Sequence, residues 1–108
     1  MSAVIPVQSS VKKEHDMKDY IATHTFKSEE ARKQHFAAIS SMTPEQMKSA
    51  LKNEKASFQM NWGNKDAMVT YCWWKANSPD DILNTLGDLA ELYNNDIKEM
   101  TEVVDLSD

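Results

Sequence analysis

The sequence predicts an α+β fold built on one four-stranded antiparallel sheet. Residues 57–62 alternate polar and apolar side chains, which is typical of a strand with one buried face. A turn cluster at 63–66 separates them from a second strand-like run, so the two runs form an antiparallel hairpin. Helix-start signals at Ser28 and Ser78 each follow a strand-like run. Together these observations predict the element order βαββαβ.

The first half of the chain contains a tail, a strand and a helix. Residues 1–18 mix small, polar and charged side chains without a period, so we expect a tail there and the folded domain over residues 19–108. Aromatic and β-branched residues dominate 20–26 and predict the first strand. The helix that begins after Ser28 carries acidic residues in its first turn, which complement the helix dipole. Its apolar stripe, expected to meet the sheet, consists of Ala31, His35, Phe36 and Ile39.

The second half of the chain supplies the remaining elements. The sequence Thr-Pro-Glu-Gln at 43–46 predicts a short helix that ends near Leu51. The return strand of the hairpin, 67–75, is apolar or aromatic on both faces, as in a central strand. Residues 101–106 predict the fourth strand. A long helix is expected after Ser78, with an apolar stripe of Ile82, Leu83, Leu86, Leu89, Ala90, Tyr93 and Ile97.

The predicted topology places both helices on one side of the sheet, with the strand order 4-1-3-2. The hairpin register divides its side chains between two faces. We assign to the helix side Phe58, Met60, Trp62, Val69, Tyr71 and Trp73. The opposite face would carry an exposed apolar patch of the kind that marks an interface. We therefore expect a homodimer through the open sheet face, with the contact residues Met68, Thr70, Cys72 and Trp74.

Charge and composition exclude several classes of partner. The net charge of −5 and the single arginine, Arg32, argue against nucleic-acid binding, because phosphate contacts need clustered cations. The same charge disfavours membrane surfaces, and no apolar run approaches the roughly 20 residues of a membrane-spanning helix. The lone Cys72 forms no intramolecular disulfide, and the N-terminal residues lack the apolar core of a secretory signal. We therefore expect a cytoplasmic location.

Four segments together resemble the dimeric α+β-barrel superfamily, which has a ferredoxin-like fold: IATHTFKSEEARKQHF, FQMNWGNKDAMVTYCWW, KANSPDDIL and MTEVVDL. Within it the chain is most similar to short uncharacterised proteins with a strand ending in TF and a final EV-x-x-L strand. The resemblance covers roughly residues 19–107 and implies a dimer whose two sheets face each other. Members include cofactor-free monooxygenases, haem-degrading enzymes and lactone isomerases. The haem-degrading members carry a ligating histidine on the second helix, and residues 78–100 here contain none, so we expect no cofactor.

Aromatic and methionine side chains are the candidate ligand contacts. Flat aromatic walls and adaptable methionines can line a pocket for an elongated or flat apolar molecule, here between sheet and helices. The residues expected to contact it are Trp62, Trp73, Tyr71, Met60, Phe58, Phe36, Tyr93 and Arg32. The simpler interpretation is that the aromatic residues only fill the core.

Two histidines are the candidate catalytic residues. His24 on the first strand and His35 on the first helix can move a proton, because imidazole titrates near neutrality. The alternative for each is a hydrogen-bonded histidine within the core. A metal site is not expected, since the histidines and Cys72 show no metal-binding spacing. Three functions remain open: a small-molecule-binding homodimer, a cofactor-independent monooxygenase or isomerase, and an interaction module without a pocket.

Overall fold

The computed structural model describes residues 17–107, so most of the expected tail, residues 1–16, lies outside the described part. The strands are β1 (Lys18–Phe26), β2 (Ala56–Trp62), β3 (Val69–Ala76) and β4 (Tyr93–Met100). The helices are α2 (Glu29–Ser40), α3 (Pro44–Leu51), α4 (Pro79–Leu86) and the 3₁₀ helix η2 (Gly87–Leu92). The predicted α+β class is confirmed.

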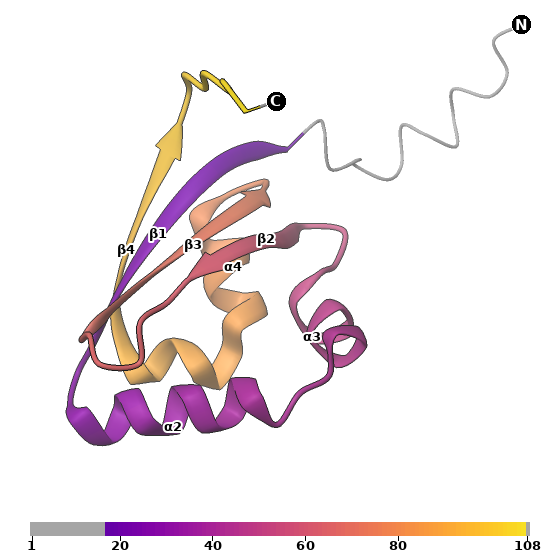
Figure 1. Cartoon of the computed structure of the whole chain (residues 1–108). Coiled ribbons are helices and arrows are strands. Elements are labelled where there is room, and N and C mark those ends of the chain that lie inside the picture. The colour runs from indigo at the N-terminus through magenta and orange to yellow at the C-terminus, as the bar shows by residue number, and fades with distance from the viewer. Residues whose placement is uncertain (1–16, 108) are drawn as a thin grey trace, which may run out of the picture.

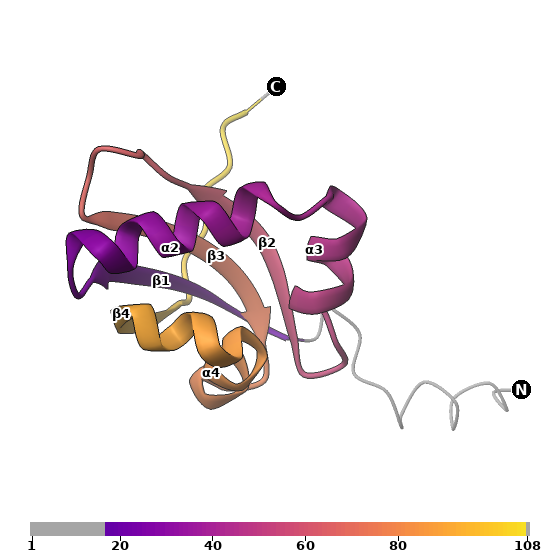
Figure 2. The ribbon, with the colours of Figure 1, turned by 90° about the horizontal axis from the view of Figure 1, so that it is seen from below.

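The four strands form one antiparallel sheet in the order β2-β3-β1-β4. Figure 1 shows α2, α4 and η2 beneath this sheet, with α3 beside the end of β2. The view from below in Figure 2 shows the same helices in front of the strands. One face of the sheet is therefore covered by helices, and the other has no helix over it in either view. We call this second surface the open face.

Helix N-termini form where the capping signals predict them. The Ser28 hydroxyl accepts a 3.0 Å hydrogen bond from the backbone N–H of Ala31. Thr43 and Gln46 make a reciprocal capping box, with Pro44 in the first helical turn. Ser78 caps α4 in the same way as Ser28 caps α2. These local contacts satisfy backbone donors that a helix leaves unpaired at its start.

The predicted long helix after Ser78 is wrong in its second half, and so is the predicted strand at 101–106. The helix α4 ends at Leu86, and its C-cap Gly87 has a φ of 58°, which residues other than glycine rarely adopt. After η2 the chain becomes β4 and pairs with β1. Residues 101–107 have no regular secondary structure, and Val103, Val104 and Leu106 are largely exposed.

The assignment of the two sheet faces is also wrong, except for Phe58, which does lie on the helix side. Thr70, Cys72 and Trp74 are buried beneath the helices, with exposed fractions of 0%, 5% and 0%, so they cannot form an interface on the open face. Met68 precedes β3 and is exposed. Because Trp73 alternates with Trp74 in the strand, it points to the open face.

Charge explains which face the helices cover. Asp19, Lys75, Asp96 and Lys98 share the face of Trp73, and covering it with helices would remove all four charges from water. The face of Trp74 carries alanines instead, since Ala22, Ala56 and Ala76 are fully buried there and leave room for the large indole. An irregularity in β2 between Phe58 and Met60 turns Phe58 to this side, where its ring lies 5.3 Å from that of Trp74.

Candidate functional site

The open face carries large apolar side chains that no helix within residues 17–107 covers. Met60 and Trp62 on β2 lie opposite Trp73 and Tyr71 on β3. The exposed fractions are 46% for Met60, 50% for Trp62 and 43% for Tyr71. A contiguous exposed patch of this kind is unusual on a monomer and is typical of surfaces that bind a protein or a ligand.

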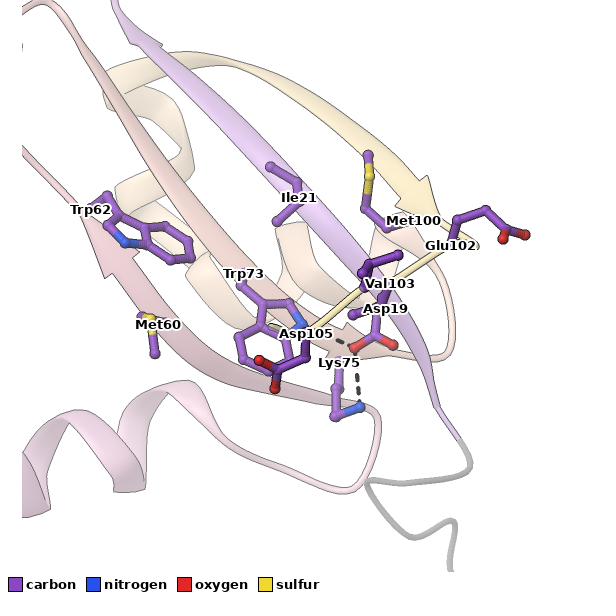
Figure 3. Close-up of a pocket in the computed structure, with 11 residues that line it drawn as sticks. Asp19, Ile21, Met60, Trp62, Trp73, Lys75, Met100, Glu102, Val103 and Asp105 are labelled. Carbon is purple, nitrogen blue, oxygen red and sulfur yellow. Dashed lines mark hydrogen bonds and ion pairs between the residues drawn. The ribbon is translucent and has the colours of Figure 1, made fainter. Parts of the chain in front are cut away.

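A groove of about 700 Å³ lies on this face. Strand residues Ile21, Trp62 and Trp73 line it, and the segment after β4 contributes Val103 and Val104. Figure 3 shows the side chains around it, with the two tryptophans coming from neighbouring strands. The remaining lining residues are Asp19, Met60, Lys75, Met100, Glu102 and Asp105. The groove is thus bounded by the sheet on one side and by the C-terminal segment on another.

A hydrogen-bonded trio holds Trp73 in place at the groove. Its indole Nε1 donates to Asp19 Oδ1 over 2.9 Å, and Lys75 Nζ donates to the same oxygen over 3.0 Å. The Lys75 ammonium also lies 5.8 Å from the centroid of the Trp73 ring. Burial acts to raise the pKa of Asp19, but the hydrogen bonds from Trp73 and Lys75 and the lysine charge outweigh it, so this pKa is lowered. The carboxylate therefore stays ionised at neutral pH.

The candidate catalytic histidine His24 lies on the opposite side of the sheet from the groove. Its side chain is fully buried, its Nδ1 lies 2.8 Å from Asn95 Oδ1, and the centre of its ring lies 4.2 Å from that of the tilted Tyr93 ring. Its Nε2 has no hydrogen-bond partner among residues 17–107. Burial lowers the pKa of His24 to about 4, against a raising effect of the Asn95 contact, and the repulsion that a protonated His35 would exert acts in the same direction as burial.

His35 joins the same cluster from α2. Its ring packs edge-on against Phe36 and Tyr93 at 5.0 and 5.7 Å, and lies 5.1 Å from Phe26. Burial lowers the pKa of His35 as well, and within the described chain its Nδ1 has no partner. The structure therefore brings the two predicted histidines together, as neutral imidazoles inside the core.

The predicted ligand contacts divide between the two faces of the sheet. Trp62, Trp73 and Met60 line the groove, and Tyr71 lies beside them on the open face. The other four lie on the helix side: Phe58, Phe36, Tyr93 and Arg32. Of these, Phe36 and Arg32 border a separate surface hollow of about 270 Å³ along α2. The expected pocket residues do not form one site between sheet and helices.

Sequence reasoning missed the polar part of the groove and its C-terminal wall. Asp19 and Ile21 are two residues apart on β1, as Trp73 and Lys75 are on β3, so the members of each pair share one face of the sheet. This spacing of two residues was a usable signal. Val103 and Val104 carried no such signal, because the pattern of residues 101–106 predicts a strand and gives no indication that the segment borders a groove.

Other chemistries find little support in the described chain. Burial raises the pKa of the Cys72 thiol to about 12, although Asn61 contacts its sulfur and acts in the opposite direction. Among residues 17–107 no group of three or more His, Cys, Asp or Glu side chains is placed to hold a metal ion. No helix in the same range is long and apolar enough to cross a membrane.

Comparison with known proteins adds no assignment. No protein family, curated protein or solved structure matches the chain. The groove and the fold that presents it are therefore the basis for assigning a function.

Proposed function

We propose that the chain forms a homodimer through its open face and binds an apolar small molecule in the groove lined by Trp62 and Trp73. The observation that carries this proposal is the 50% exposure of Trp62 beside Trp73 in a groove of about 700 Å³. Small-molecule sites typically have volumes of about 300–1,000 Å³ and apolar or aromatic walls. The ligand site is thus placed on the open face instead of between sheet and helices.

The homodimer would cover the exposed patch on the open face. Two-fold dimers are the commonest oligomers, and their interface uses the same patch on both copies. Met60, Trp62 and Tyr71 would form its centre, which replaces the interface residues expected from the sequence. The arrangement agrees with the resemblance to the ferredoxin-like dimeric α+β-barrel superfamily, in which two sheets face each other. A second copy would also close the groove.

The location proposed for this dimer is the cytoplasm. The lone Cys72 is buried and has a strongly raised pKa, so it is not poised to form an intermolecular disulfide. Proteins without disulfides are typical of reducing compartments.

Light scattering tests the dimer. The wild-type chain at micromolar concentration should have about twice its monomer mass of 12.3 kDa. The Trp62→Glu variant should dissociate, because it places a charge at the centre of the patch, whereas Gln34→Glu on the exposed surface of α2 should not. A wild-type mass near that of the monomer would contradict the dimer.

Binding of Nile red, a flat neutral dye, tests the groove independently. The dye should gain fluorescence with the wild-type protein and lose most of its affinity in Trp73→Ala, which alters the groove outside the proposed centre of the interface. Leu106→Ala is the matched control, because Leu106 is 87% exposed but does not line the groove. Native mass spectrometry of the purified protein should also detect bound apolar material. Absence of dye binding and of any co-purified molecule would favour an interaction module without a ligand.

The second candidate function is a cofactor-independent monooxygenase or isomerase. The pair His24 and His35 favours it, because neutral imidazoles with an unpartnered buried nitrogen can accept a proton. Anthrone is a suitable probe, since one O₂ converts it to anthraquinone and water. Oxygen uptake with anthrone should then be lost in His24→Ala and His35→Ala while both variants remain folded. Equal uptake by the wild type and both variants would reject this candidate.

A further inference from the structure

We infer that the ligand of the groove is an organic cation with a flat apolar body. The inference rests on the proposed function, because it names the chemical class of the molecule that the groove would hold. It is carried by the charges that line the groove and by the way its aromatic wall already accommodates an ammonium group.

The lining of the groove is acidic. It contains three carboxylates, Asp19, Glu102 and Asp105, and one ammonium group, that of Lys75. Lys75 is already bound to Asp19 at 3.0 Å, so the trio with Trp73 is internally neutralised. Glu102 and Asp105 have no basic partner within residues 17–107. Two uncompensated negative charges therefore belong to the wall formed by the C-terminal segment.

Asp105 is held as a carboxylate. The Ser107 hydroxyl and backbone N–H both donate to its Oδ1, and these bonds lower the pKa of Asp105. In Figure 3 the Glu102 carboxylate points away from the tryptophans, and Asp105 lines the same groove as Trp73. Glu102 and Asp105 therefore both contribute negative charge to the lining of the groove.

The aromatic wall accepts cations. The Lys75 ammonium lies 5.8 Å from the Trp73 ring centroid, within the roughly 6 Å over which a cation is attracted to a ring face. The Trp62 ring, half-exposed on the neighbouring strand, offers a second such face. A delocalised or quaternary cation with a flat body would therefore stack on indole and remain close to a carboxylate.

An anionic ligand would be repelled by the charges that line the groove. Its charge would lie near Glu102 and Asp105, and Lys75 is already engaged by Asp19. The net charge of −5 over the whole chain adds to this repulsion and steers cations toward the protein. Charge thus selects among flat apolar molecules of the same size.

Three bicyclic probes of similar size separate charge from shape: 1-methylquinolinium as the cation, quinoline as the neutral molecule and 1-naphthoate as the anion. Titrations at about pH 7.5 are followed through the indole N–H signals of Trp62 and Trp73 in ¹H–¹⁵N NMR spectra. We expect the dissociation constant of 1-methylquinolinium to be at least about tenfold lower than that of 1-naphthoate, with quinoline between them. This advantage should shrink at about 0.5 M salt, which screens exposed charges.

Two double variants locate the charges responsible. Glu102→Gln with Asp105→Asn should weaken 1-methylquinolinium binding several-fold and leave quinoline binding unchanged. The control, Glu54→Gln with Glu91→Gln, removes the same net charge from exposed positions that do not line the groove and should leave both affinities near wild type.

The outcomes distinguish this inference from the proposed function. If none of the three probes shifts the indole signals, the groove does not bind small molecules and the proposed function fails. If quinoline or 1-naphthoate binds as tightly as 1-methylquinolinium, the groove binds flat molecules without selecting cations, and only this inference is overturned. An equal loss of cation binding in both double variants also overturns it, because the selectivity then comes from the overall charge.

Discussion

The indole Nε1 of Trp73 donates a 2.9 Å hydrogen bond to Asp19 Oδ1, which joins the centre of β3 to the start of β1 on the open face. This bond fixes the ring plane of Trp73, one of the two tryptophans that line the groove, and leaves the Asp19 carboxylate shared with Lys75. The side chains of a binding surface keep a more constant orientation when hydrogen bonds of this kind hold them.

Trp73→Phe should therefore lower the free energy of unfolding by about 1 kcal/mol, the typical net contribution of a hydrogen bond to a charged group that stays partly solvated. Asp19→Asn should cost a similar amount, and the double variant less than the sum, because both changes remove the same bond. Urea denaturation measures all three. Trp62→Phe on the same face, measured in a monomeric form of the chain, is the control and should change stability by less than about 0.5 kcal/mol. Strict additivity of the two single variants would show that the bond contributes nothing.

Trp74→Ala and Trp62→Ala should differ sharply in their effect on stability. Trp74 is fully buried beneath the helices, so its removal leaves a large cavity and should cost about 3–5 kcal/mol. Trp62 is 50% exposed, and its removal from a monomeric form of the chain should cost less than about 1 kcal/mol. Thermal or urea unfolding of the two variants checks this expectation. Similar losses at the two positions would mean that the faces of the sheet are assigned incorrectly.

Gly87→Ala should destabilise the fold by about 1–3 kcal/mol, because the backbone there has φ 58° and ψ −127°, a region that is strained for alanine. The cost is conformational, since an added Cβ at this position meets no atom within 4 Å. Gly63→Ala is the matched control: its φ is not positive, and its Cβ would make ordinary contacts of 3.4–3.5 Å. Equal effects of the two changes on the midpoint of urea unfolding would contradict the backbone argument.

Stability should fall with acid because of His24. Its folded-state pKa is about 4, below the usual value of 6.5, so the unfolded chain binds the proton more readily than the folded chain. The stabilisation is complete above pH 6.5 and is lost as the pH falls from 6.5 toward 4. This loss should amount to at most about 3.5 kcal/mol, since each pKa unit corresponds to about 1.4 kcal/mol.

His24→Gln tests this origin, because glutamine fills a similar volume without titrating in this range. The dependence of the unfolding free energy on pH between about 6.5 and 4 should become shallower in the variant, whatever its absolute stability. His35, whose pKa is lowered in the same direction, accounts for part of the slope that remains. An unchanged slope in His24→Gln would assign the acid sensitivity to other groups.

Local signals in the sequence determined the class of this fold and its helix starts. Ser28, Thr43 and Ser78 cap helices where they were expected to, since capping depends on residues three positions apart. The alternation at 57–62 and the following turn likewise predicted the β2–β3 hairpin. Residue type and the assumed sheet face predicted Trp62, Trp73 and Met60 as ligand contacts between sheet and helices, whereas they line a groove on the opposite, open face.

Tertiary structure decided the end of α4, the covered face of the sheet and the far wall of the groove. Tyr93 and Ile97 are four residues apart, which suits a helix stripe and one face of a strand equally. Their conformation is settled by pairing with β1, where Asn95 meets His24 across 71 residues of sequence. A period of two separates the faces of a strand without naming the one that helices cover, because that choice depends on the charges that Asp19, Lys75 and the other strands bring to each face.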